Sequence, residues 1–194
     1  KWKRQALKQY GFPVGEGLYT DMNAIRRDED LDNLHSIYVD QWDWEKVISR
    51  EMRTMATLKD AMQRIVTAIC ATLDLLHWKY AGLPVRLTRE CTFITTQELE
   101  DMYPSLTPKQ REQEVTRQHG TVGLLQIGGK LRSGQPHDGR APDYDDWSMN
   151  GDILFWDETL QCAMEISSMG VRVSPESLDE QLRLSGNDDR RTLP

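Results

Sequence analysis

The chain has 194 residues, with 31 acidic and 24 basic side chains and a formal net charge of −7. This length can bury a core, and the mean hydropathy of −0.64 argues against a membrane-embedded chain. Its acidic balance disfavours general nucleic-acid binding, which relies on Lys and Arg to neutralise phosphates. Three widely spaced cysteines without a CxxC pair predict neither a disulfide framework nor a structural zinc site. We therefore expect a cytoplasmic protein without nucleic-acid or membrane partners.

A strand with an unusual polar face is expected in the segment 21–45. If residues 37–44 alternate in the ordinary way, Ile37, Val39, Gln41 and Asp43 share one face. Buried amides and carboxylates are costly unless they have partners. This face is either a structural network or, as we favour, the floor of a site for a polar ligand.

Helical spacing of apolar residues predicts a long amphipathic helix between Glu45 and Tyr80, with a break near Ser49 as an alternative. Turn and capping signals place the other elements. These are a strand at Cys91–Ile94, a helix after the capping box Thr95–Glu98, a helix from Thr107 to Gly120, strands at Thr121–Ile127, Ile153–Trp156 and Met164–Ser167, and a helix from Ser174 to Gly186.

Familiar catalytic motifs are absent from the sequence. The turn at Gly128-Gly129-Lys130 has neither the Walker A spacing nor a GxGxxG pattern, and no GxSxG or HExxH occurs. The polar residues that indicate a site are instead dispersed: Lys3, Arg26, Gln41, Asp43, Asp152, Glu165 and Arg172. This set suits a charged small molecule together with a metal-bound nucleotide.

Asp152 and Glu165 lie on neighbouring predicted strands. Carboxylates on adjacent strands can share a hard cation such as Mg²⁺ through their oxygens. By spacing alone, two unrelated surface acids at strand ends are the more common arrangement, and both interpretations stay open at this point.

Five stretches resemble the ammonia-dependent asparagine synthetases, that is, the aspartate–ammonia ligases. The most specific contain VDQWDWE and SSMGVRV, and the resemblance covers nearly the whole chain. The stretches are Gly17–Met22, Ser36–Glu45, Arg140–Trp147, Asn150–Leu154 and Glu165–Val173. The resemblance implies an α+β fold with a class II aminoacyl-tRNA synthetase-like catalytic core, an antiparallel β-sheet flanked by helices. It also implies one catalytic domain over 1–194, incomplete at both ends and in the 148–149 loop.

The activity implied by the resemblance is that of an ATP-dependent ligase. Members of the family are homodimers that form L-asparagine from L-aspartate and ammonia through β-aspartyl-AMP, releasing AMP and pyrophosphate. The expected cofactors are ATP and Mg²⁺. No protein nucleophile is required, which agrees with the missing nucleophile motifs.

The resemblance also implies roles for individual residues. Arg26 matches the class II motif 2 arginine, which contacts the α-phosphate. In the aspartate site, Lys3 and Arg172 would hold the α-carboxylate, and Gln41 and Asp43 would receive the α-ammonium. Ser168 is expected in the same site because it lies within the strand end that carries Glu165.

The remaining roles concern the nucleotide and ammonia. Asp152 and Glu165 match the magnesium ligands, and they therefore also belong to the ATP site. His35 is expected to reach the outer phosphates, with a surface histidine as the alternative. Asp145 is the candidate carboxylate that accepts a proton from ammonium.

Two other functions stay open from the sequence. The first is an aminoacyl-tRNA synthetase of the aspartyl or asparaginyl type, which the acidic charge disfavours. The second is a catalytically inactive module that senses aspartate, asparagine or an adenylate, which the lack of the Gly-rich motif 3 after the last helix would explain.

Overall fold

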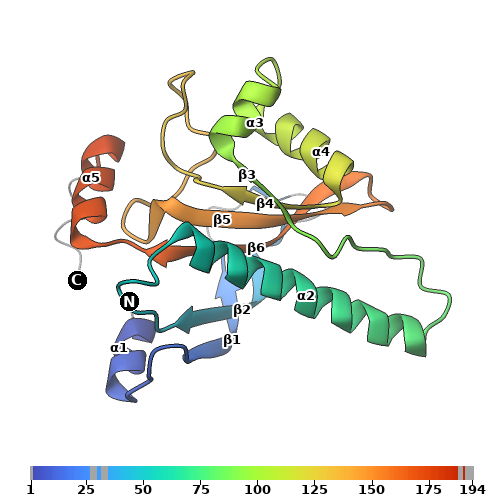
Figure 1. Cartoon of the computed structure of the whole chain (residues 1–194), viewed down its shortest axis with the longest axis horizontal. Coiled ribbons are helices and arrows are strands. Elements are labelled where there is room, and N and C mark those ends of the chain that lie inside the picture. The colour runs from blue at the N-terminus through green and yellow to red at the C-terminus, as the bar shows by residue number, and fades with distance from the viewer. Residues whose placement is uncertain (1, 27–29, 32–34, 188–189, 191–194) are drawn as a thin grey trace. The chain divides into compact units, whose positions relative to one another are not determined.

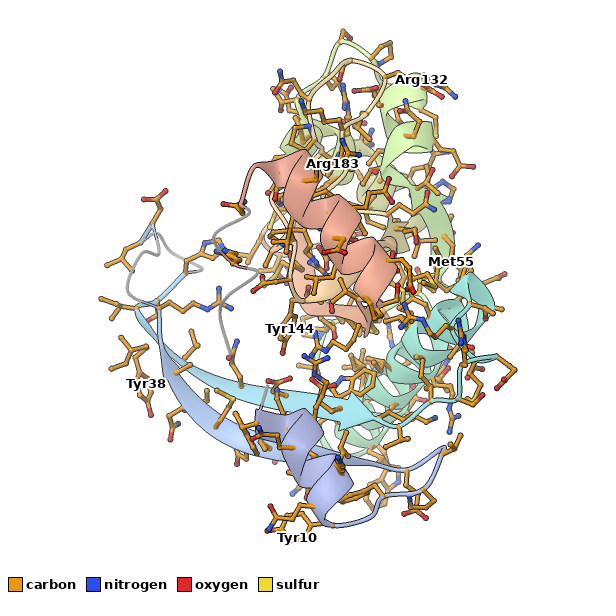
Figure 2. All side chains as sticks on the ribbon, turned by 90° about the vertical axis from the view of Figure 1, so that its left-hand side faces the viewer. Tyr10, Tyr38, Met55, Arg132, Tyr144 and Arg183 are labelled. Carbon is orange, nitrogen blue, oxygen red and sulfur yellow. The ribbon has the colours of Figure 1, made fainter. Side chains whose placement is uncertain are left out.

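The computed structural model describes residues 2–26, 30, 31, 35–187 and 190, and the chain forms two compact units, 1–53 and 54–194. In the first unit, helix α1 (Trp2–Gln9) is followed by an antiparallel ribbon of strands β1 (Gly17–Ile25) and β2 (Tyr38–Lys46). Figure 2 shows α1 lying against this curved ribbon. The sequence patterns above predict β2 but neither α1 nor β1.

The predicted alternation along β2 is confirmed. Val39, Gln41 and Asp43 are half-buried and Glu45 is buried, whereas the side chains between them are exposed. Ile37 was expected on the same face, but it precedes the strand and is exposed. We call the face that carries Gln41 and Asp43 the inner face of the ribbon.

The second unit is built on a four-stranded sheet in the order β3-β4-β5-β6. The strands are β3 (Thr92–Thr95), β4 (Thr121–Leu125), β5 (Asp145–Asp157) and β6 (Cys162–Arg172). Strand β3 pairs in parallel with β4, and the other pairs are antiparallel. The sheet is therefore antiparallel except at one edge.

Helices cover both faces of this sheet (Figure 1). Helix α2 (Met55–Lys79) packs on one face, where Met62 and Val66 meet Ile153 and Phe155. Helices α3 (Thr96–Met102) and α4 (Pro108–His119) cover the other, where Leu99 meets the β4 side chains. Helix α5 (Pro175–Ser185) follows β6. Among the described residues, no helix is both long and apolar enough to cross a membrane.

The predicted start of the long helix at Glu45 is wrong. Glu45 and Lys46 end strand β2, and the helix begins at Met55 after the N-cap Thr54, whose hydroxyl accepts a hydrogen bond from the Thr57 amide. Propensity does not reveal this boundary, because cross-strand pairing with β1 holds residues 38–46 extended. The capping box at Thr95–Glu98 is confirmed.

Removing a core side chain from α2 tests this architecture. Met62 is 0% exposed, so Met62→Ala should lower the free energy of unfolding by about 2–5 kcal/mol through lost burial and a residual cavity. Urea denaturation measures the change. Arg64→Ala on the same helix, where the side chain is 73% exposed, should stay within about 0.5 kcal/mol of wild type. Equal effects of both substitutions would contradict the assigned core.

Candidate functional site

In the first unit, the inner face of the ribbon carries a partly buried ion pair with helix α1. Lys3 is 4% exposed, and its ammonium pairs with the Asp43 carboxylate. A buried ammonium group needs such a partner, because desolvation of an unpaired charge is costly. Gln41 lies two residues along on the same face, so the structure brings these three predicted aspartate-site residues together.

Arg26 lies at the far end of the ribbon from this pair. Its amide donates to the Ile37 carbonyl at 2.8 Å, which continues the β1–β2 pairing by one residue. Arg26 is exposed, one residue beyond the end of β1, and Asp43 lies roughly 20 Å further along the ribbon. His35 is exposed, at the other end of the same connection. Residues 27–29, which belong to the same predicted motif, lie outside the described residues.

In the second unit, Asp145 and Arg172 are directly paired across strands β5 and β6. Arg172 Nη1 donates to Asp145 Oδ1 at 2.7 Å, and its guanidinium stacks 3.4 Å from the centre of the Tyr144 ring. Helix α5 supports this corner through the buried Gln181, whose amide donates to the Asp145 carbonyl at 2.9 Å. The predicted carboxylate-binding arginine and the predicted proton acceptor are therefore neighbours.

A β-bulge brings Glu165 onto the face of the sheet that carries Asp152. Asp152 is opposite Ser168, and Leu154 is opposite Glu165, so β6 has one extra residue, Ile166, between these pairs. Strict alternation would place Ser168 and Glu165 on opposite faces, since they are three residues apart. The bulge shifts the phase by one residue, so both side chains share the face of Asp152.

Asp152 and Glu165, with the side chains around them, form a cluster in which protonation of a carboxylate or binding of a cation is favoured. Burial raises the pKa of Asp152, while Arg140 and a hydrogen bond from Ser168 oppose that rise. The pKa of Glu165 is raised to about 7, first by desolvation and then by repulsion from Asp152, against opposing attraction from Lys109. The Glu165 side chain still reaches solvent, so a ligand can approach it.

This donor set fits a magnesium ion that is bound together with phosphate groups. Two neighbouring carboxylates provide oxygen ligands, and a cation would relieve their mutual repulsion. The described residues contain no group of three His, Cys, Asp or Glu side chains arranged for a metal. Mg²⁺ would therefore rely on phosphate oxygens and water for its other ligands, as it does in many nucleotide sites.

Arg140 and Lys109 are members of this cluster that sequence reasoning did not single out. Arg140 donates to Asp152 Oδ1 at 3.0 Å. The positive charge of Lys109, on helix α4, acts to lower the pKa of Glu165. Arg140 is the first residue of a stretch that resembles the family, and this position could have identified it as a site residue. Lys109 lies in a polar helix and gave none.

The raised pKa of Glu165 predicts a pH-dependent stability in metal-free buffer. The folded protein binds this proton more tightly than the unfolded chain, whose carboxyl titrates near 4.5. Stability should therefore fall as pH rises from about 4.5 to about 7. Glu165→Gln should remove about 1 kcal/mol of that fall, a figure discounted for solvent screening.

Thermal or urea unfolding at about pH 5 and about pH 8 checks this result. Glu158→Gln, which alters an exposed acid in the turn between β5 and β6, is the matched control. A stability difference between wild type and Glu165→Gln that stays constant across this range would contradict the crowding of the two carboxylates.

Two solved structures resemble the fold. An aspartyl-tRNA synthetase from Entamoeba histolytica matches with a TM-score of 0.67 and 15% identity, over 99% of this chain and 41% of that chain. An asparaginyl-tRNA synthetase from the same organism, solved with asparaginyl-adenylate, matches with a TM-score of 0.60 and 12% identity, over 87% and 41%. The expected class II synthetase-like fold is confirmed.

Relatives of higher identity are named aspartate–ammonia ligases. The protein from Lactobacillus johnsonii is 60% identical over 195 residues, which cover 100% of this chain and 58% of the relative. The protein from Bacillus cereus strain B4264 is 56% identical over 191 residues, or 98% and 58%. The chain thus spans somewhat more than half the length of these relatives. The family model described as aspartate-ammonia ligase matches residues 1–194. The chain belongs to the aspartate–ammonia ligase family.

Proposed function

We propose that the whole protein is an ATP-dependent ligase that forms L-asparagine from L-aspartate and ammonia. The reaction would proceed through β-aspartyl-AMP and release AMP and pyrophosphate. The observation that carries this proposal, beside the family match, is the partly buried Lys3–Asp43 pair, with Gln41 on the same ribbon face as Asp43. An amino acid has a carboxylate and an ammonium group, and it can replace this internal pair by binding the lysine and the aspartate separately.

The roles in the aspartate site follow the family resemblance. We assign the α-carboxylate of aspartate to Lys3 and Arg172, because a guanidinium fork binds a carboxylate through two donors. Gln41 and Asp43 would receive the α-ammonium, and Ser168 would complete the site. The β-carboxylate then remains to attack the α-phosphate of ATP.

The nucleotide would be held by positive charge and a metal ion. Arg26 would contact the α-phosphate and offset charge as pyrophosphate leaves. It lies roughly 13 Å along the strand from Gln41, four residue pairs away, a span suited to an extended aspartyl-adenylate. Asp152 and Glu165 would hold Mg²⁺, which supplies charge neutralisation on the phosphates. His35 would reach the outer phosphates.

Asp145 would handle ammonia. It forms ion pairs with Arg172 and Arg140. We assign Asp145 to accept a proton from ammonium near the β-carbon. We expect the active protein to be a cytoplasmic homodimer without a nucleic-acid partner.

Product analysis tests the proposed reaction. The full-length protein, incubated with aspartate, ATP, Mg²⁺ and ammonium, should yield asparagine and AMP in equal amounts. Release of ADP, or no nucleotide turnover, would contradict the proposal. Aspartylation of tRNA would instead indicate a synthetase, and calorimetric binding of aspartate without turnover would indicate an inactive sensor.

Arg26→Ala should mainly impair adenylate formation. Loss of one fixed cation at the departing phosphate should reduce the rate by about 10²–10³-fold. Aspartate-dependent exchange of pyrophosphate into ATP measures this step directly. Arg4→Ala, which removes an exposed arginine of helix α1, is the control. An unchanged exchange rate in Arg26→Ala would refute the assigned phosphate contact.

Lys3→Ala should mainly raise the KM for aspartate. Lys3 is buried, and removing its ammonium takes one charged donor from the substrate carboxylate, so an increase in KM of about tenfold is expected. Lys8→Ala, at an exposed position of the same helix, should leave KM unchanged. If Lys3→Ala keeps the wild-type KM, the placement of the α-carboxylate on Lys3 is wrong.

A further inference from the structure

Arg140 contacts three separate strand positions in the second unit. Its Nη1 donates to Asp152 Oδ1 at 3.0 Å, and its Nη2 lies 3.5 Å from Asp145 Oδ2 and 3.3 Å from the Met169 carbonyl oxygen. The side chain is only 15% exposed. One planar guanidinium therefore joins the beginning of β5, the middle of β5 and strand β6, a task for which its several fixed donors are suited.

Two glycines leave room for this arrangement. A Cβ at Gly128 would lie 2.8 Å from the Arg140 Cβ and 2.7 Å from the Trp147 ring, and Gly128 also has a φ of +112°. A Cβ at Gly170 would lie 2.7 Å from the Asp145 carboxyl carbon. A side chain at position 128 would thus collide with Arg140, and one at position 170 would collide with its partner Asp145.

The contacts of Arg140 connect two functional groupings. Asp145 is shared with Arg172, which we assign to the α-carboxylate of aspartate, and Asp152 is paired with Ser168 beside Glu165. Loss of Arg140 would leave the buried Asp152 without its guanidinium partner and Asp145 with one fewer cation. Both carboxylates would then be free to change orientation.

We propose that Arg140 is a positioning residue that fixes Asp145 and Asp152 relative to each other, so that the aspartate-binding and metal–nucleotide-binding groups are organised together. This inference rests on the proposed function. It differs from a general stabilising role because it requires that one substitution weakens two chemically different ligands.

Calorimetric titration of the full-length protein tests this inference. L-aspartate and Mg²⁺–ATP are titrated separately into wild type, Arg140→Ala and Arg140→Lys. In Arg140→Ala, each Kd should rise by about tenfold or more, with an unchanged number of sites. In Arg140→Lys, at most one Kd should recover, because a single ammonium group cannot bridge both carboxylates in the same way.

Arg132→Ala provides a matched control from the same loop. Arg132 also pairs with an aspartate, Asp101, but its side chain is 74% exposed, so both Kd values should stay within about twofold of wild type. The inference is overturned if Arg140→Ala changes neither Kd or only one. It is equally overturned if Arg140→Lys restores both, or if the Arg140 variants lose only thermal stability and binding sites. A wild-type protein that makes no asparagine would instead refute the proposed function.

Discussion

Charged side chains near the sheet surfaces of this protein are accommodated by pairing with opposite charges. Lys3 pairs with Asp43 in the first unit. In the second unit, Arg140 pairs with both Asp145 and Asp152, and Arg172 pairs with Asp145. An unpaired charge in the same surroundings would be prohibitively costly. The pairing therefore holds in place the charged groups that we assign to ligand binding.

Pairing requires that the backbone presents both partners on one face at the correct spacing. In the ribbon, ordinary alternation does this, because Gln41 and Asp43 are two residues apart. In the sheet, alternation is insufficient, and the bulge at Ile166 adds the residue that brings Glu165 beside Asp152. A second irregularity lies between Asp145 and Asn150, where five steps along β5 correspond to two along β6.

The like charges of two carboxylates explain why this cluster favours a bound cation. Asp152 and Glu165 repel one another, and desolvation by burial raises the pKa of both carboxyl groups. Arg140 compensates part of this repulsion and leaves a site that favours an added cation. In the proposed reaction, substrate binding exchanges internal ion pairs for ion pairs with the ligand, which limits the free-energy cost of desolvation.

Much of the outline could be predicted from the sequence alone. Periodicity and capping signals placed α3, α4, α5 and the inner face of β2, because these depend on residues close together in the chain. The stretches of family resemblance indicated the fold and family, which the comparisons confirm. The roles assigned to individual site residues remain proposals.

Other features were decided by tertiary structure. The sequence patterns did not predict helix α1, strand β1 or the true start of α2. They also did not predict the contacts of Arg140. The reason is that long-range contacts determine them. A strand end depends on its pairing partner, the phase of β6 depends on its register with β5, and Arg140 joins residues that lie well apart in the chain. The sequence by itself therefore determined which charged groups are available, and only the folded backbone decided which of them meet.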